Sequence, residues 1–296
     1  MNTEFKKITL FIGNVVESLT PLLELIEVLK DFRTEFSLNS LDFRWDLNSL
    51  ANTYGLSYRD NEHCKETDLA ITLGGDGTFL QALHVISQSK YMFGINLGTL
   101  GFLTDINTRK IKTAIPAILS GHFQQEERSL LTACLEGSEK EQNSINALNE
   151  IAILGIEPQR MIDYDIYVDG RFVCNHRANG LLCATPTGST AYSLSAGGAI
   201  LHPSVQGINL IPICPHSLQS RSIVIPITSE ISVSFGRKNL KQIVCYGDGQ
   251  KFLTLSVHNQ LKVVKSSRRL NLIHPSSYDY YSSLRSKLAW GDHLVE

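Results

Sequence analysis

The sequence has no excess of charge of either sign. Its 27 lysines and arginines are balanced by 29 aspartates and glutamates, which gives a formal net charge of −2 with the nine histidines taken as neutral. Proteins that bind nucleic acid through bulk electrostatics need a clear positive excess. We therefore expect no nucleic-acid partner.

A long hydrophobic run is also missing. The first apolar stretch, Ile8 to Ile12, follows a polar N-terminus. It is too short for the core of a signal peptide and far too short for a transmembrane helix, which takes about 20 apolar residues. We expect a soluble, unexported protein with no membrane partner.

Paired cysteines and metal-ligand spacings are absent as well. No C-x-x-C pair occurs among the six cysteines, which are Cys64, Cys134, Cys174, Cys183, Cys214 and Cys245. Scattered cysteines favour reduced, buried thiols over a zinc site or a disulfide framework. No metal-ligand spacing occurs at His63, His84, His122, His176, His202, His216 or His274. We expect a cytoplasmic protein with no metal site of its own.

In the first third of the chain, short apolar runs alternate with segments whose apolar residues recur at the spacing of a helix. The apolar runs 7–13, 69–73 and 91–95 predict strands, and the spacing of apolar residues predicts helices over 19–29 and 79–86. This alternation is typical of a parallel sheet covered by helices. With 43% hydrophobic and 19% charged residues, the chain has an ordinary globular composition and the length of about two domains.

Strand patterns dominate after one further helix, predicted over 111–121. Alternating or apolar runs predict strands at 162–168, 222–227, 231–235, 242–246 and 253–257, and Asp169-Gly170 predicts a hairpin turn. We predict an N-terminal Rossmann-like α/β domain (1–106) and a β-rich, sandwich-like, mostly antiparallel domain (107–274). A C-terminal segment (275–296) is expected to carry a helix, over 280–290, that packs back on the first domain.

The first candidate site is Gly74-Gly75-Asp76-Gly77-Thr78, where a strand leads into a helix. Glycines let a phosphate approach the backbone, and the first helical turn offers unpaired N–H groups. No Gly-Lys-Ser/Thr closes a Walker-type loop and no G-x-G-x-x-G follows a strand, so a nucleotide would be held in another way. The same residues are also typical of a tight turn in which Asp76 caps the helix.

The second candidate is the segment from Thr185 to Gly198, which is dense in hydroxyls and small residues. Such a stretch suits a ligand rich in hydroxyls and phosphates. The alternative is a polar loop whose hydroxyls cap a short helix. A serine hydrolase is disfavoured because Gly188-Ser189-Thr190 lacks the second glycine of G-x-S-x-G.

The third candidate is Asn149-Glu150, an amide and a carboxylate that together suit the edge of a sugar or a base. Because charged residues are mostly exposed, a solvated strand start is the alternative. Surface side chains would explain Arg160, Arg177 and Gln250 equally well. We interpret the basic group Lys262, Lys265, Arg268 and Arg269 as a solvated strand face.

Together these segments resemble the NAD kinase family, over about Asp68 to Trp290. The Thr185–Gly198 run is the most specific part, since a bare Gly-Gly-Asp-Gly also occurs in lipid kinases and phosphofructokinases. The other motifs in family order are Gly74–Gly77, Gly94–Asn96 with Gly101–Asp105, Asn149-Glu150, Pro212–Leu218, Asp248–Gln250 and Asn271–Pro275.

The resemblance implies transfer of the ATP γ-phosphoryl group to the 2′-hydroxyl of the adenosine ribose of NAD, giving NADP. It implies a divalent cation, Mg²⁺, carried on ATP, and a homodimer or homotetramer. Asp76 resembles the general base, and Gly74, Gly75 and Gly77 resemble a phosphate loop. The implied NAD-binding residues are Asp76, Gly77, Asn149, Glu150, Arg160, Arg177, Asn179, Thr190, Ala191, Tyr192, Ser193, Leu194, Ser195 and Gln250; at position 179 the family usually has Asp.

Two other functions are compatible with the residues. One is a kinase of the same loop type that acts on a sugar phosphate or a lipid head group, although no membrane-binding stretch supports a lipid. The other is a nucleotide-binding regulator without catalysis, for which the loop acid would be expected to be lost. Asp76 is present.

Overall fold

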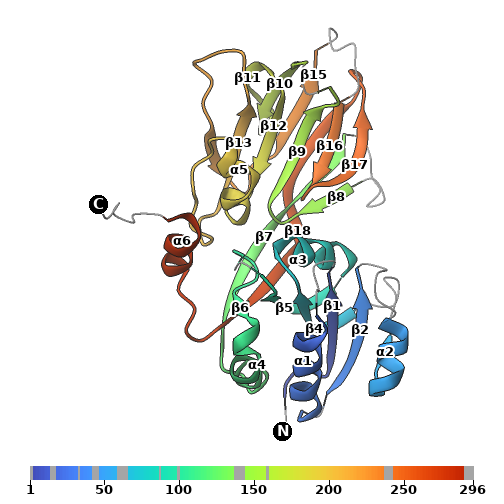
Figure 1. The fold of residues 1–296 in the computed structure, drawn as a ribbon. Helices are drawn as coiled ribbons and strands as arrows, with labels where there is room; N and C mark the ends of the chain where they lie inside the picture. The colour runs from blue at the N-terminus through green and yellow to red at the C-terminus, as the bar shows by residue number, and fades with distance from the viewer. Residues whose placement is uncertain are drawn as a thin grey trace. The chain divides into compact units, whose positions relative to one another are not determined.

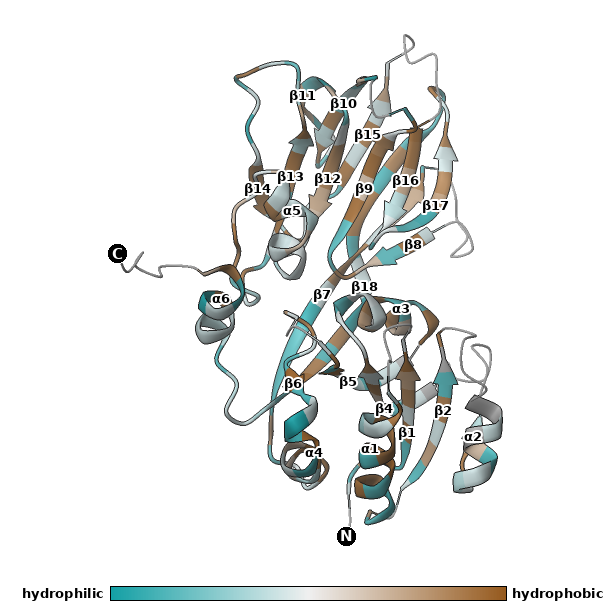
Figure 2. Cartoon of the chain, viewed as in Figure 1, coloured by the Kyte–Doolittle hydropathy of each residue, from teal (hydrophilic) through white to brown (hydrophobic). Residues whose placement is uncertain are grey.

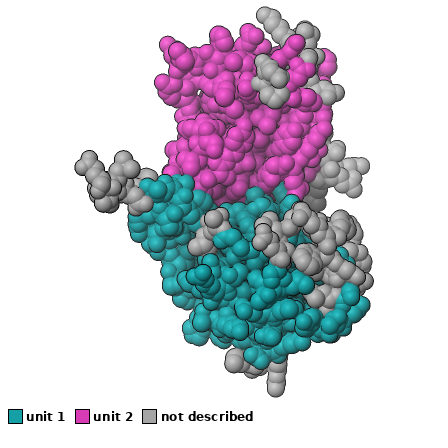
Figure 3. All heavy atoms as spheres, in the orientation of Figure 1, with its two compact units in different colours: residues 1–127, 270–296 teal, residues 128–269 magenta. Residues whose placement is uncertain are grey.

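The computed structural model describes residues 3–13, 18–32, 34–41, 47–58, 66–86, 88–98, 101–136, 144–157, 160–236 and 243–289. The chain divides into two compact units, coloured in Figure 3: a first unit of residues 1–127 and 270–296, and a second unit of residues 128–269. Both the C-terminal segment and residues 107–127 belong to the first unit.

The first unit is built from strands that alternate with helices (Figure 1). Its elements are β1 (Lys7–Ile12), α1 (Thr20–Lys30), β2 (Glu35–Ser40), α2 (Leu47–Tyr54), β3 (Ser57–Tyr58), β4 (Glu66–Leu73), α3 (Asp76–Val85), β5 (Gln88–Asn96), β6 (Ile106–Asn107), the 3-10 turn η1 (Thr108–Lys110), α4 (Ile111–Leu119) and α6 (Tyr280–Leu288). Two further strands, β7 (Phe123–Leu135) and β18 (Gln260–Pro275), contain residues of both units.

The sheet of the first unit is parallel, with the strand order β18-β5-β4-β1-β2-β3. The order reverses between β1 and β4, because the chain continues from β1 to one side and from β4 to the other. Glycines end both strands, and the Gly13 N–H donates to the Leu73 carbonyl at 3.1 Å. Ligands of open α/β sheets bind at such a switch point, outside the carboxyl ends of the strands.

Sequence patterns explain these elements directly. All residues of β1 after Lys7 are buried, as expected for a strand covered on both faces. Pro21 starts α1, which buries Leu22, Leu25, Ile26 and Leu29 and packs against α4. Figure 2 shows the hydrophobic residues along β1. This packing places residues 107–127 in the first unit, and the Rossmann-like prediction is confirmed.

The second unit consists mainly of antiparallel strands. Its elements are β8 (Ser144–Ala147), β9 (Glu150–Gly155), β10 (Ile162–Val168), β11 (Arg171–Ala178), β12 (Gly180–Ala184), the 3-10 turn η3 (Thr187–Thr190), α5 (Tyr192–Ser195), β13 (Gly207–Ile213), β14 (Ile223–Pro226), β15 (Ile231–Phe235), β16 (Ile243–Gly247) and β17 (Gln250–Leu255).

Two layers of strands enclose the core of this unit. One sheet has the order β14-β13-β12-β9-β16-β17, and the other layer contains β11-β10-β15-β18 together with β7 and β8. Alternate residues of β10 point inward, and the hydroxyl of buried Tyr164 donates to the Gly180 carbonyl of β12 at 2.9 Å. The sandwich and the Asp169-Gly170 hairpin are therefore confirmed.

The structure corrects two predictions about exposure, those for the cysteines and for the basic group on β18. The five described cysteines are free thiols, but Cys214 is exposed, unlike buried Cys183 and Cys245; Cys64 and His63 lie outside the described residues. The basic group on β18 is not wholly solvated, because Arg268 is partly buried, which lowers its pKa. No helix among the described residues is long and apolar enough to cross a membrane.

Candidate active site

The glycine loop lies at the switch point of the first unit, between β4 and α3. A methyl group on Gly74 would lie 2.2 Å from the Thr78 hydroxyl oxygen, so packing within the loop requires this glycine. A methyl group on Gly75 or Gly77 would meet nothing within 4 Å. The backbone is therefore open beside the start of α3, where the first helical turn presents N–H groups that favour an anion.

Asp76 is the first residue of α3, and its carboxylate holds the loop that follows β5. Oδ2 accepts the Phe102 N–H at 2.8 Å. Oδ1 accepts the N–H groups of Leu103 and Thr104, both at 3.1 Å, and the Thr104 hydroxyl at 2.9 Å. Gly75, not Asp76, occupies the N-cap position. The alternative in which Asp76 only caps its helix is therefore wrong.

The two carboxylate oxygens of Asp76 differ in what they can still accept. Oδ1 has three donors, whereas Oδ2 has one and keeps a lone pair for a further hydroxyl. A methyl group on Gly101 would lie 1.8 Å from Oδ1, so this clamp requires glycine there. Gly101 to Asp105 was predicted as a motif from the sequence, but its contact with Asp76 was not.

A buried histidine holds the end of the same loop. Asp105 Oδ2 accepts from Nδ1 of His274 at 2.8 Å, and Glu126 Oε2 lies 3.5 Å from Nε2. The Tyr278 ring stacks on the imidazole at 3.8 Å. Burial alone would lower the pKa of His274, but the nearby carboxylates of Asp105 and Glu126 outweigh burial and raise it. The contact between His274 and Asp105 thus ties β18 to the loop that Asp76 holds.

In the second unit, Asn149 and Glu150 are 9% and 7% exposed, so the solvated strand start is wrong. The carboxylate of Asp248 holds this segment, because it accepts the N–H groups of Leu148 and Asn149 at 2.7 Å and of Glu150 at 3.2 Å. Asp248 has a positive φ of 48° in the turn before Gly249. These hydrogen bonds of Asp248 were not predicted from the sequence, although the Asp-Gly dipeptide indicates the turn.

Glu150 is the unusual acid of the second unit. Its Oε2 is buried and has no hydrogen-bond partner among the described residues. Burial, helped by the nearby charge of Asp248, raises the pKa of Glu150 to about 7. Near neutral pH this carboxyl can therefore either accept or donate a hydrogen bond to a ligand.

The hydroxyl-rich segment is attached to the same place. The Thr185 N–H donates to the Asn149 carbonyl at 2.9 Å, and the Thr185 hydroxyl donates to the Leu148 carbonyl at 2.5 Å. A methyl group on Gly188 would lie 2.1 Å from the Asn149 oxygen. Local capping is part of the explanation, since the Gly188 N–H donates to the Thr185 hydroxyl, but the buried Ser193 hydroxyl has no partner among the described residues.

The structure divides the predicted NAD-binding residues of the second unit into two groups. Strand β12 pairs with β9 so that Ala184 faces Glu150 at one end and Gly180 faces Leu154 at the other. The first end has Asn149, Glu150, Thr190, Ala191, Tyr192, Ser193, Leu194, Ser195 and Gln250; the second has Arg160, Arg177 and Asn179. Four residue steps along the strand separate Gly180 from Ala184, a distance of roughly 13 Å.

The second group has its own local contacts. Asn179 joins β9 to β13, since its N–H donates to the Ile213 carbonyl at 2.9 Å and its carbonyl accepts the Gly155 N–H at 3.2 Å. Arg177 is exposed, and exposed Arg160 forms an ion pair with Glu157 at 3.1 Å. Within one chain, these residues do not converge with Asn149 and Glu150.

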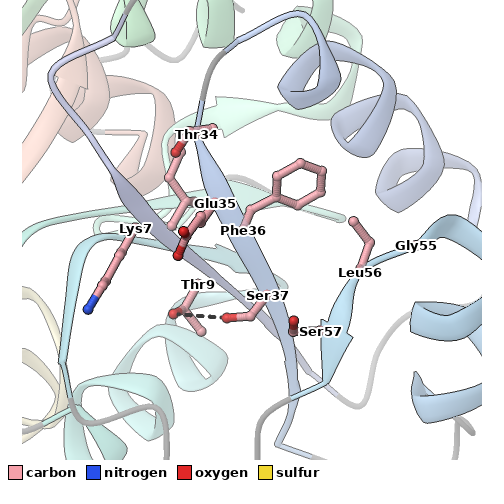
Figure 4. A pocket seen from close by; sticks show the side chains of 10 residues that line it. Lys7, Thr9, Thr34, Glu35, Phe36, Ser37, Gly55, Leu56 and Ser57 are labelled. Atoms are coloured by element: carbon pink, nitrogen blue, oxygen red, sulfur yellow. Dashed lines mark hydrogen bonds between the residues drawn. The ribbon is translucent and has the colours of Figure 1, made fainter.

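A pocket of about 270 Å³ in the first unit lies elsewhere (Figure 4). It is lined by the beginnings of β1 and β2 and by β3, including Lys7, Thr9, Glu35 and Ser37. Because the strands are parallel, this is the end opposite to the Gly74–Asp76 loop. It contains none of the predicted site residues.

A glycine loop at the switch point of a Rossmann-like sheet, followed by a sandwich with a buried acid and a hydroxyl-rich segment, defines a nucleotide-binding protein of two units. Residues 26–123 match the ATP-NAD kinase N-terminal domain, and residues 148–275 match the ATP-NAD kinase C-terminal domain. The chain belongs to the NAD kinase family.

Curated relatives support this assignment. The NAD kinase of Chromohalobacter salexigens is 40% identical over 230 residues, which cover 77% of this chain and 78% of the relative. One from Coxiella burnetii is 42% identical over 231 residues, covering 78% and 77%. One from Pseudomonas fluorescens is 37% identical over 279 residues, covering 93% of each chain.

Two solved structures share the fold. Yeast NADH kinase complexed with NADH has a TM-score of 0.85 at 23% identity and covers 100% of this chain and 96% of its own. An NAD kinase from Archaeoglobus fulgidus in complex with ATP has a TM-score of 0.72 at 24% identity, covering 96% and 98%. The predicted family and fold class are confirmed.

Proposed function

We propose that the protein transfers the γ-phosphoryl group of ATP to the 2′-hydroxyl of the adenosine ribose of NAD. The ribose oxygen forms a bond to the γ-phosphorus while the bond to the β,γ-bridging oxygen breaks, which releases ADP and NADP. The hydroxyl proton passes to Asp76. Membership of the NAD kinase family supports this reaction over a sugar-phosphate or lipid kinase and over a regulator.

The geometry of Asp76 carries the proposal. Oδ2 accepts only the Phe102 N–H and retains a lone pair for the 2′-hydroxyl, while the three donors on Oδ1 fix the carboxylate. Phosphoryl transfer passes through a loose transition state, in which the bond to the attacking oxygen is only partly formed. The base therefore does not need to remove the hydroxyl proton before the transfer begins. Such a base typically contributes about 10²- to 10⁴-fold to the rate.

The first unit supplies the phosphate side of the proposed reaction. Gly75 and Gly77 leave the backbone open at the start of α3, where N–H groups face an anion. No three acids, cysteines or histidines among the described residues lie close enough together to hold a metal ion. We propose that Mg²⁺ is bound together with the substrate, as MgATP, in which it neutralises part of the triphosphate charge.

The second unit supplies the dinucleotide side. Asn149 offers an amide and Glu150 a carboxyl that is close to half protonated at neutral pH, and Asp248 fixes the backbone of both. Together they can accept from and donate to a ribose diol or an adenine edge. The segment Thr190–Ser195 lies at the same end of β12 and adds further hydroxyl and backbone groups.

We also propose a cytoplasmic homo-oligomer, dimeric or tetrameric. Exposed apolar residues lie on two edge strands of the second unit: Phe172 and Val173 on β11, and Ile223 and Val224 on β14. A second copy that covers such an edge would remove apolar surface from water. Light scattering after gel filtration tests this, and a monomer at micromolar concentration would contradict it.

A direct assay tests the function. Purified protein is incubated with MgATP and NAD, and NADP is measured with an NADP-specific dehydrogenase, with NADH and sugar phosphates as competing acceptors. We expect one NADP for each ADP formed and no product without ATP. ADP formation that depends on a sugar phosphate, without NADP from NAD, would favour the alternative kinase; binding of NAD and ATP without turnover would favour the regulator.

A further inference from the structure

Lys287 is a half-buried lysine that the reaction described above does not use. It lies in the last turn of α6, and its side-chain nitrogen is shielded from solvent without a hydrogen-bond acceptor among the described residues. An ammonium group has three N–H donors and is almost never buried unless an anion partners it. The Lys287 nitrogen therefore lacks, among the described residues, the acceptor that a shielded lysine is expected to have.

Asp76 and the loop that it holds lie near this nitrogen. The nitrogen of Lys287 lies 4.4 Å from the centroid of the Phe102 ring, and the Phe102 N–H is the one donor to Asp76 Oδ2. The carboxylates of Asp76 and Asp105 attract the ammonium, which opposes the lowering of the Lys287 pKa by burial. The cation therefore belongs to the electrostatic surroundings of the proposed base.

The C-terminal segment is anchored so that Lys287 reaches this place. The Asp279 carboxylate caps α6 by accepting the N–H groups of Tyr281 and Ser282. Leu284, almost one helical turn before Lys287, is 2% exposed. The stack of His274 and Tyr278 fixes the chain before the helix. These anchors hold the last turn of α6 against the loop around Phe102.

The chemistry requires a cation at this position that the two loops lack. No lysine or arginine occurs between Leu73 and His84 or between Asn96 and Thr108. A Walker-type loop contributes its own lysine to the phosphates, but this glycine loop has none. Phosphoryl transfer spreads negative charge over the three equatorial oxygens, and a positive side chain lowers the free energy of that state. A lysine ammonium suits this role as a point charge.

We infer that Lys287 is a catalytic residue whose ammonium binds the phosphoryl group as it moves from ATP to the ribose hydroxyl at Asp76. This inference rests on the proposed function. The Lys287 ammonium would then contact the γ-phosphate of MgATP before transfer and the 2′-phosphate of NADP after transfer. NAD, which lacks that phosphate, gains nothing from Lys287.

Charge removal on α6 tests the inference. K287M keeps the length of the side chain and removes the charge, and R285M removes the exposed neighbouring charge on the same helix as the matched control. For K287M we expect kcat to fall by about 10²-fold, the typical effect of losing one group that stabilises transition-state charge. The Kd of NADP should rise at least about tenfold while that of NAD stays within about threefold. R285M should match the wild type in all three.

A purely structural role predicts different results. If Lys287 only holds the Phe102 ring in place, K287M should lower the melting temperature. F102L should then lower kcat as much as K287M does. Under the inference, K287M keeps or raises the melting temperature, because it removes a buried charge without an acceptor, and K287R recovers part of the lost kcat. Wild-type kcat and NADP affinity in K287M, or an equal loss of NAD and NADP binding, would overturn the inference.

Failure of the proposed function would be recognised separately. If the wild type forms no NADP, calorimetric titration with MgATP still distinguishes K287M from R285M. Weaker MgATP binding in K287M alone would support the phosphate contact and reject only the assigned acceptor. Equal MgATP affinity in both variants would reject the contact as well.

Discussion

Asp76 in the first unit and Asp248 in the second make the same kind of hydrogen-bonded contact with the backbone, but the two contacts have different surroundings. Each carboxylate accepts hydrogen bonds from three consecutive backbone N–H groups, Asp76 from residues 102–104 and Asp248 from residues 148–150. Asp76 lies beside open backbone at the start of a helix, whereas Asp248 serves to present another acid, Glu150. The same carboxylate contact thus holds the proposed phosphate site in one unit and the proposed dinucleotide site in the other.

The two acids that we assign to ligands also differ in their solvation. Asp76 accepts four hydrogen bonds, whereas Glu150 Oε2 has no partner among the described residues and burial raises the Glu150 pKa to about 7. Under the proposed function, Asp76 accepts a proton and Glu150 forms hydrogen bonds with hydroxyl groups. Substitutions at these acids and at glycines of their loops test this division.

Substitution by alanine should reduce stability strongly at Gly188 and very little at Gly75. Gly188→Ala places a methyl group 2.1 Å from the backbone oxygen of Asn149, and we expect a loss of about 4 kcal/mol or more in the free energy of unfolding. Gly75→Ala meets nothing within 4 Å and should change stability by less than about 0.5 kcal/mol while raising the KM for ATP. Urea unfolding and steady-state kinetics measure both. Equal stability of the two variants would show that residues 185–190 are not held against Asn149.

Glu150 should make stability depend on pH. Its folded-state pKa of about 7 exceeds the usual 4.5, so the folded protein binds the proton more tightly than the unfolded chain. The free energy of unfolding should therefore fall as pH rises from about 4.5 to about 7, by up to about 3 kcal/mol, and stay low above that range.

The comparison of Glu150→Gln with the wild type isolates this effect. The variant lacks the titration, so its stability relative to the wild type should increase between pH 5 and pH 8 in urea unfolding experiments. Glu27→Gln, on the exposed side of α1, serves as the control. A pH-independent difference would mean that Glu150 titrates normally in the folded protein.

Substitution by asparagine should mainly lower kcat at Asp76 and mainly lower stability at Asp248. Asp76→Asn keeps the shape but cannot take up the proton, so we expect kcat to fall by about 10²-fold or more, with NAD affinity within about tenfold. Asp248→Asn places an amide where N–H groups need acceptors, so it should cost about 1–3 kcal/mol of stability and change kcat by less than about tenfold. Similar kcat values for both variants would remove Asp76 from the role of base.

The smallest effect is expected at Asn179, at the end of β12 remote from Glu150. Asp only accepts hydrogen bonds, whereas Asn both accepts and donates, so Asn179→Asp alters a ligand contact without touching the phosphates. The NAD KM should shift by up to about tenfold, roughly 1.4 kcal/mol, with little change in kcat. Kinetics with NAD varied at saturating MgATP measure this. A kcat change beyond about a hundredfold at constant KM would place Asn179 at the reacting atoms.

Much of the fold could be predicted because its signals are local. The apolar runs that became β1, β4 and β5 and the period-two pattern of β10 were identified from residues adjacent in the sequence. By contrast, β18 was not predicted as one strand of 16 residues, because its basic residues interrupt the apolar pattern. Packing in two units, with Leu261 and Val263 buried in one and Leu272 and Ile273 in the other, overrides that weak local signal.

The sequence by itself determined the glycine loop at the end of a strand, the hydroxyl-rich segment and the family resemblance, since each is written in consecutive residues. Only the tertiary structure decided that Asp76 holds residues 102–104, that Asp248 holds residues 148–150 from 98 to 100 positions away, and that Lys287 of the last helix lies over Phe102. It also separated Arg160, Arg177 and Asn179 from Glu150 by the length of β12. The physical reason is that burial and hydrogen bonding act between residues that folding brings together, and neither periodicity nor composition records such long-range partners.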